Sequence, residues 1–131
     1  MSTAEIDTTL SNIMHASIRV RARVRGAPGS CAGIFTYHDD KTESDIEILT
    51  RDPSTHVRYT NQPSLDADGD EIPGASTTVT MPRGASWTEW NEHRLDWTDG
   101  LNTFYVNGAL VEMKTYGVPQ IGSTVILNMV C

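Results

Sequence analysis

The strongest constraint on the fold comes from residues 17–25, where apolar and basic side chains alternate without interruption. One set of alternate positions holds Ile18, Val20, Ala22 and Val24, and the other holds four arginines. Because successive side chains of a β-strand point to opposite faces, this period of two predicts a strand with one buried and one solvated face. Long charged side chains on such a face usually serve only to solvate it.

Short runs with strand character recur along the rest of the chain. They cover residues 31–37, 43–50, 56–61, 76–81, 92–98, 101–106, 109–114 and 123–129. Asn107-Gly108 joins two of these runs and is the strongest two-residue hairpin signal. Short strands at regular spacing predict an all-β fold, either an antiparallel sandwich or a barrel. The only helix that the pattern allows is a short one over residues 6–13.

The composition restricts the classes of function. A length of 131 residues with 38% hydrophobic and 21% charged residues suits one globular domain. The net charge of -7 opposes binding to phosphate backbones and to anionic lipid, and no apolar run is long enough to cross a membrane. We therefore expect no nucleic-acid partner and no membrane partner. The first residues lack a signal-peptide pattern, and the pairing of Cys31 and Cys131 stays open.

Three carboxylates alternate in the third predicted strand. Glu43, Asp45 and Glu47 share one face of this strand. Ile46 and Ile48 share the opposite face and are expected to anchor it in the core. Neighbouring carboxylates oppose one another's ionisation, so one can hold a proton while another stays ionised, as retaining glycosidases require. Acidic alternation is also common on a solvated strand face, so the pattern alone leaves both interpretations open.

Further motifs surround this strand in a distinctive order. The Glu-x-Asp-x-Glu segment ESDIEIL is followed by the Trp-containing segment HRLDWT, by the hairpin FYVNGALV and by ILNM. It is preceded by SIRVRARVRGAPGSCAGIFTY, which has a strand, a Gly/Pro turn and a second strand. In this order and spacing, from residue 15 to residue 129, the chain resembles glycoside hydrolase family 16, the laminarinase-like endo-β-1,3(4)-glucanases.

By this resemblance the fold is a concanavalin A-like lectin/glucanase β-jelly roll, a sandwich of two packed sheets. Family domains generally have about 200 residues or more, so we expect a truncated domain that is incomplete at both ends. Residues 1–14 are then an N-terminal tail or partial element, and residues 15–131 are a partial catalytic domain. We expect the carboxylate strand to be regular, without a bulge. Lys41 and Val130 depart from the family pattern, because relatives have Trp at these positions.

The resemblance implies a glycosidase that cleaves β-1,3- or mixed β-1,3/1,4-glucan with retention. It assigns Glu43 as the nucleophile, Asp45 as the assisting residue and Glu47 as the general acid/base. No metal or cofactor takes part in this chemistry, and the implied partner is the polysaccharide substrate. We expect a monomer that acts outside the cell, where cell-wall glucan lies. A cell-wall glucan transglycosylase and an inactive or lectin-like glycan-binding fragment stay open as alternatives.

Five residues are candidates for sugar binding: Tyr37, Thr60, Gln62, Arg21 and Trp90. Alternation along residues 56–62 places Arg58, Thr60 and Gln62 on the carboxylate side. Thr60 and Gln62 could equally do no more than end a strand, and Tyr37 could pack in the core. Arg21 is a candidate through the family resemblance, and Trp90 because it lies on a loop. Trp97, in contrast, is expected in the core.

Overall fold

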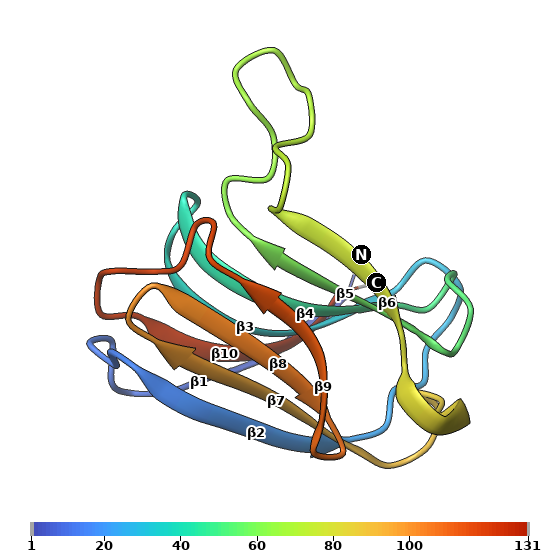
Figure 1. Cartoon of the computed structure of the whole chain (residues 1–131). Helices are drawn as coiled ribbons and strands as arrows, with labels where there is room; N and C mark the ends of the chain where they lie inside the picture. Colours follow the sequence, from blue (N-terminus) through green and yellow to red (C-terminus); the bar gives the residue numbers. More distant parts are fainter. Residues whose placement is uncertain (1, 131) are drawn as a thin grey trace.

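The computed structural model describes residues 2–130, which form two antiparallel β-sheets packed face to face (Figure 1). The strands are β1 (Thr3–Asp7), β2 (Ala16–Ala22), β3 (Cys31–Asp39), β4 (Thr42–Leu49), β5 (His56–Asn61), β6 (Ser76–Thr80), β7 (Asn91–Thr98), β8 (Leu101–Val106), β9 (Ala109–Lys114) and β10 (Thr124–Val130). One sheet has the order β1-β10-β3-β4-β5-β6 and the other β2-β7-β8-β9. Within residues 2–130 the only helical element is the 3-10 turn η1 (Pro82–Gly84), and no helix there could cross a membrane. The all-β sandwich predicted from the sequence is confirmed.

The N-terminal segment corrects one prediction. The helix expected over residues 6–13 is wrong, because Ile6 belongs to β1 and lies opposite Leu127 of β10. Ile13 forms an isolated bridge with Ser123. The backbone groups of this segment thus bond to a strand near the other end of the chain. A weak local helical pattern is readily overridden by such long-range pairing.

β2 has the two faces that its alternation predicts. Ile18 packs against the core cluster, and Val24, just beyond the strand, is itself a buried member of that cluster. Arg19 and Arg21 are exposed on the opposite face. β2 pairs with β7, with Val20 opposite His93, and so belongs to the four-stranded sheet.

The core lies between the two sheets. Its largest buried side chains include Trp97, Tyr59, Phe104 and Leu95. The ring centroids of Tyr59 and Phe104 are 4.7 Å apart, which joins β5 of one sheet to β8 of the other. The indole N–H of Trp97 donates to the carbonyl of Pro119 at 3.0 Å, so its polar atom is satisfied. The prediction that Trp97 packs in the core is confirmed.

The hairpin between β8 and β9 forms at the predicted dipeptide. Asn107 and Gly108 have φ angles of 51° and 81°, the left-handed values that a type I′ turn requires at both central residues. Val106 and Ala109 pair across the turn. The side-chain oxygen Oδ1 of Asn107 also accepts a hydrogen bond from the backbone N–H of Glu92 at 2.9 Å, which connects the turn to the start of β7.

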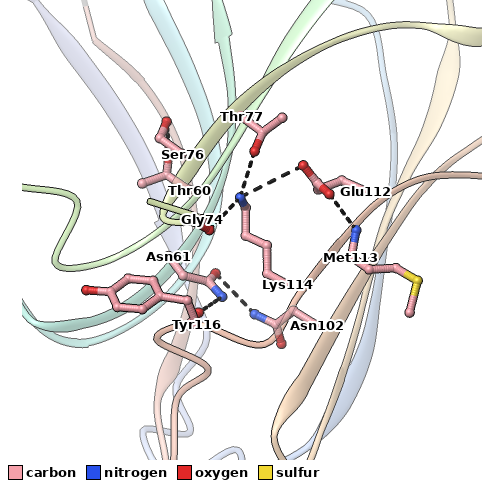
Figure 2. A network of polar contacts seen from close by, with 10 residues as sticks. All are labelled: Thr60, Asn61, Gly74, Ser76, Thr77, Asn102, Glu112, Met113, Lys114 and Tyr116. Carbon is pink, nitrogen blue, oxygen red and sulfur yellow. Dashed lines mark hydrogen bonds and ion pairs between the residues drawn. The ribbon is translucent and has the colours of Figure 1, made fainter. Parts of the chain in front are cut away.

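Buried polar contacts join the two sheets. Asn102 of β8 donates from Nδ2 to Ser44 Oγ of β4 at 2.7 Å and to Asn61 Oδ1 of β5 at 3.2 Å. Figure 2 shows the side chains of Asn61 and Asn102 facing each other in this layer. Nearer the sheet edges, Lys114 of β9 donates to the hydroxyl of Thr77 on β6 at 3.0 Å (Figure 2). These contacts fix β4, β5 and β6 relative to the four-stranded sheet.

Candidate active site

β4 directs alternate side chains toward the core and away from it. The core-facing residues are Ser44, Ile46 and Ile48, all of them buried. Ser44 accepts a hydrogen bond from Asn102 of the other sheet, which identifies the inward direction. Glu43, Asp45 and Glu47 therefore point to the outer face of the six-stranded sheet. The pairing of β4 with β3 is unbroken from Glu43 to Leu49, so the carboxylate strand is regular, as predicted.

Asp45 is the most buried of the three carboxylates. Its residue exposure is 3%, and its Oδ2 atom has no hydrogen-bond partner among residues 2–130, whereas Glu43 and Glu47 are partly exposed. Burial raises the pKa of Asp45, and the adjacent Glu43 and the charge of Glu47 raise it further, while a side-chain contact with Gln62 opposes them. This environment favours a protonated Asp45 between two carboxylates, where its O–H can donate a hydrogen bond.

Glu47 lies directly opposite Arg58 of β5. Burial raises the pKa of Glu47, the positive charge of Arg58 lowers it, and Glu43 raises it. Arg58 is held by Asp52, to which its Nε donates at 3.2 Å and its Nη2 lies at 3.1 Å. Asp52 therefore holds the guanidinium of Arg58 in place beside one end of the carboxylate row.

β3 supplies the neighbours on one side of the carboxylates. Phe35 pairs with Asp45, and Tyr37 pairs with Glu43, so both rings stand on the carboxylate face. The hydroxyl of Tyr37 donates to Asp40 Oδ1 at 2.8 Å. Tyr37 thus lies where the sequence-based hypothesis requires it, with its polar end bound to the adjoining turn.

β5 and the residue after it supply the neighbours on the other side. Thr60 pairs with Asp45, and the backbone N–H of Gln62 donates to the carbonyl of Glu43 at 2.9 Å. The hydroxyl of Thr60 lies 2.9 Å from that of Ser76 on β6. Gln62 also borders a hollow of about 290 Å³ next to Lys41 and residues 116–121. The structure therefore brings Thr60, Gln62 and the three carboxylates together.

Arg21 and Trp90 do not join this group. Arg21 lies on β2 of the four-stranded sheet, exposed on the side that faces away from the core. Its guanidinium carbon is 5.9 Å from the centroid of the Trp90 ring, and that of Arg23 is 5.3 Å away. Because the carboxylates occupy the outer face of the other sheet, the sandwich separates them from Arg21 and Trp90. Alternation predicts which face of a strand is solvated, but not the sheet to which the strand belongs.

Asp52 was not singled out from the sequence. Its role depends on its contact with Arg58, which forms only in the folded chain. The hollow beside Gln62 was equally unexpected, because residues 116–121 are distant in sequence from β5. Among residues 2–130, no group of three or more His, Cys, Asp or Glu side chains is placed to hold a metal ion. Cys31 is a free thiol whose pKa is raised to about 11, first by burial, and Cys131 lies outside the described residues.

The two packed antiparallel sheets define the fold class as a β-jelly-roll sandwich of the glucanase type. No family model and no curated protein matches the sequence. Among solved structures, the chain is similar to an apo Crh5 transglycosylase, with 24% identity and a TM-score of 0.76 over 97% of this chain. It is also similar to a β-glucanase from Bacillus licheniformis, with 21% identity and a TM-score of 0.75 over 96% of this chain.

A third similar structure is the laminarinase catalytic domain from Thermotoga maritima MSB8, with 17% identity and a TM-score of 0.75 over 96% of this chain. The chain spans 52% of the transglycosylase and 57% of each of the other two structures. These comparisons establish the fold and confirm the jelly roll that the resemblance implied.

Proposed function

We propose that this chain is part of a family 16 glycoside hydrolase that cleaves β-1,3- or mixed β-1,3/1,4-glucan with retention. The main support is the row of Glu43, Asp45 and Glu47 on the outer face of β4, with Asp45 buried between two partly exposed glutamates. The Glu-x-Asp-x-Glu motif and the jelly-roll fold are independent of each other and favour the same family. On this proposal the substrate is an extracellular polysaccharide and the protein acts as a monomer.

The proposed reaction has two steps. In the first, a carboxylate oxygen of Glu43 bonds to the anomeric carbon while the glycosidic bond breaks and Glu47 gives its proton to the leaving oxygen. In the second, Glu47 takes a proton from water as the water oxygen bonds to the anomeric carbon and the bond to Glu43 breaks. Two inversions at the same carbon give net retention.

Asp45 is proposed to position the nucleophile. Its burial and its carboxylate neighbours favour the protonated form, which can donate a hydrogen bond to Glu43 before attack. Arg58 limits the rise in the pKa of Glu47 that burial causes. Glu47 can then both release and recover a proton during one cycle.

The sugar is proposed to lie across β3, β4 and β5. Tyr37 offers a ring beside Glu43, and Thr60 and Gln62 offer polar atoms on the other side of the row. No contribution from Arg21 or Trp90 is included, since they lie on the opposite side of the sandwich.

The test measures reducing ends released from laminarin and from barley β-glucan. The wild-type chain should release them, and Glu43→Gln and Glu47→Gln should each lose on the order of a hundredfold or more of that rate. Lys41→Gln, which removes a nearby charge outside the carboxylate row, is the matched control and should stay active. Release by Glu43→Gln at the wild-type rate, or no release by the wild-type chain, would show that the proposal is wrong.

Transglycosylation is a second candidate, because a Crh5 transglycosylase is among the matched structures. Incubation of laminarin with a fluorescent laminari-oligosaccharide distinguishes the two outcomes. A transferase lengthens the labelled acceptor without an equivalent increase in reducing ends, whereas a hydrolase does not lengthen it. Binding of laminarin with neither product indicates the glycan-binding alternative.

A further inference from the structure

An exposed tryptophan lies beside two arginines on the outer face of the four-stranded sheet. Trp90 directly precedes β7, which pairs with β2 (Figure 1), and it is 54% exposed. The guanidinium carbons of Arg21 and Arg23 lie 5.9 and 5.3 Å from the centroid of its ring. Both distances are within the range of about 6 Å over which an aromatic face attracts a cation. We call these three residues the Trp90 patch.

The two guanidinium groups of the patch have no anion to neutralise them. Neither Arg21 nor Arg23 forms an ion pair or a hydrogen bond through its side chain with another described residue. Glu92 lies opposite Arg21 in the pairing of β2 with β7, yet it is not in ion-pair contact with it. Arg94 on the same face, in contrast, is bound to Asp96. The patch therefore offers two planar sets of N–H donors, each of which matches the geometry of a carboxylate.

The charge of the molecule differs between its two outer faces. The net charge is -7, yet residues 19–25 alone contain four of the ten Lys and Arg residues. The outer face of the six-stranded sheet carries Glu43, Asp45 and Glu47. Strand pairing places Glu5 of β1 in line with Glu47 on that face. A polymer with negative charges is therefore repelled by the six-stranded sheet and attracted to the patch on the opposite side.

The spacing of the arginines restricts the kind of anion that fits. Arg19, Arg21 and Arg23 occupy alternate positions on and just after β2, so their spacing is about 6.6 Å. Duplex nucleic acid has one charge per about 1.7 Å, a density that this row cannot neutralise. An acidic peptide has carboxylates but no flat ring to place on Trp90. A chain of uronic acids has both, because each unit combines one carboxylate with a sugar ring that can stack on an aromatic side chain.

We propose that the Trp90 patch binds an acidic polysaccharide, a polyuronate. One sugar ring stacks on Trp90, and neighbouring carboxylates accept hydrogen bonds from Arg21 and Arg23. Arg19 extends the row of positive charge along β2. The patch and the carboxylate row occupy opposite sides of the sandwich, so the patch can hold this polymer while the row stays open to a neutral glucan. The binding does not depend on the proposed catalytic function.

The experiment titrates the chain with hexagalacturonate at low salt and follows the backbone amides and the tryptophan indole N–H groups by NMR. Amides of β2 and β7 and the indole of Trp90 should shift. The methyl ester of the same oligosaccharide keeps the sugar rings without the charges and should bind on the order of tenfold more weakly. Added salt should weaken the binding of hexagalacturonate. Glu43→Gln should bind it as the wild type does, so the result is independent of catalysis.

Two variants separate the contributions of charge and stacking. Arg21→Gln/Arg23→Gln should bind hexagalacturonate on the order of tenfold more weakly. Arg51→Gln/Arg83→Gln removes the same charge from exposed positions outside the patch and is the matched control, which should bind nearly as the wild type does. Trp90→Ala should weaken the binding of hexagalacturonate severalfold. It should not change the weaker binding of blocked hexaglutamate, which has the charges but no sugar ring.

Several outcomes would overturn the proposal. They are the absence of hexagalacturonate binding by the wild-type chain, equal binding of the methyl ester, and an equal loss in the two arginine variants. Shifts confined to the six-stranded sheet would place the ligand elsewhere. Hexaglutamate or oligothymidylate that binds the patch as tightly as hexagalacturonate would show that the patch recognises charge alone or another class of polymer. All the substituted side chains of the patch are exposed, so an unchanged amide spectrum away from it should confirm that each variant is folded.

Discussion

The substitution Asn102→Ala tests whether the buried polar contacts between the sheets stabilise the position of β4. Asn102 donates to Ser44 at 2.7 Å and to Asn61 at 3.2 Å. All three residues are at most 1% exposed, so water cannot readily replace the lost donor. Each acceptor left unpaired costs about 1 to 3 kcal/mol, which gives a gross loss of about 2 to 6 kcal/mol.

One opposing contribution reduces this loss. Asn102 Oδ1 is itself buried without a partner among the described residues. The substitution removes the desolvation cost of this atom, which is about 1 to 2 kcal/mol. The net decrease in the free energy of unfolding is therefore about 1 to 4 kcal/mol, a large fraction of the roughly 5 to 15 kcal/mol typical of a domain. For a chain of this size the melting temperature should fall by roughly 10 °C.

The assay is urea denaturation followed by tryptophan fluorescence, to which the buried Trp87 and Trp97 contribute. Thr103→Ala, the neighbouring residue on β8, is the control, because it loses only a 3.4 Å contact to the carbonyl of Asp96 and should cost less than about 1 kcal/mol. The double variant Asn102→Leu/Ser44→Ala should show a coupling of at least about 1 kcal/mol relative to the single variants. If Asn102→Ala is no more destabilising than Thr103→Ala, the contact does not stabilise the packing of β4.

Three further predictions concern titrating groups. Burial lowers the pKa of His93 to about 4 from its ordinary 6.5. Between pH 6.5 and pH 4, His93 therefore takes up a proton only in the unfolded chain. The free energy of unfolding should fall by up to about 3 kcal/mol over this pH range. His93→Leu should lack this dependence in urea denaturation, and parallel curves for the two proteins would contradict the reasoning. Burial also lowers the pKa of Lys114, against the opposing charge of Glu112, so the free energy of unfolding should rise as the pH approaches 10.5, and Lys114→Met should lose this rise. Burial raises the pKa of Glu47 while Arg58 lowers it. Arg58→Met should therefore raise the pKa of Glu47 and move the alkaline limb of the pH profile for laminarin hydrolysis to higher pH. Arg58→Lys keeps the positive charge and should leave that limb close to its wild-type position.

The sequence by itself determined the strands other than β1, together with the orientation of the carboxylates. A period of two is a local property, because each side chain in a strand points opposite to the one before it. The solvated arginines of β2, the core-facing Ile46 and the position of the hairpin at Asn107 all follow from this local rule. The same rule predicted that Glu43 and Glu47 share one face.

Only the tertiary structure decided which strands are neighbours. Arg21 has the predicted exposure, yet its strand pairs with β7 and so lies on the far side of the sandwich from the carboxylates. Asp45 is buried, and Arg58 is held beside Glu47 by Asp52, because β3 and β5 flank β4. Strand pairing joins backbone groups that are far apart in sequence, and every strand offers the same backbone groups. The choice among partners therefore depends on packing across the whole sandwich, which no short stretch of sequence contains.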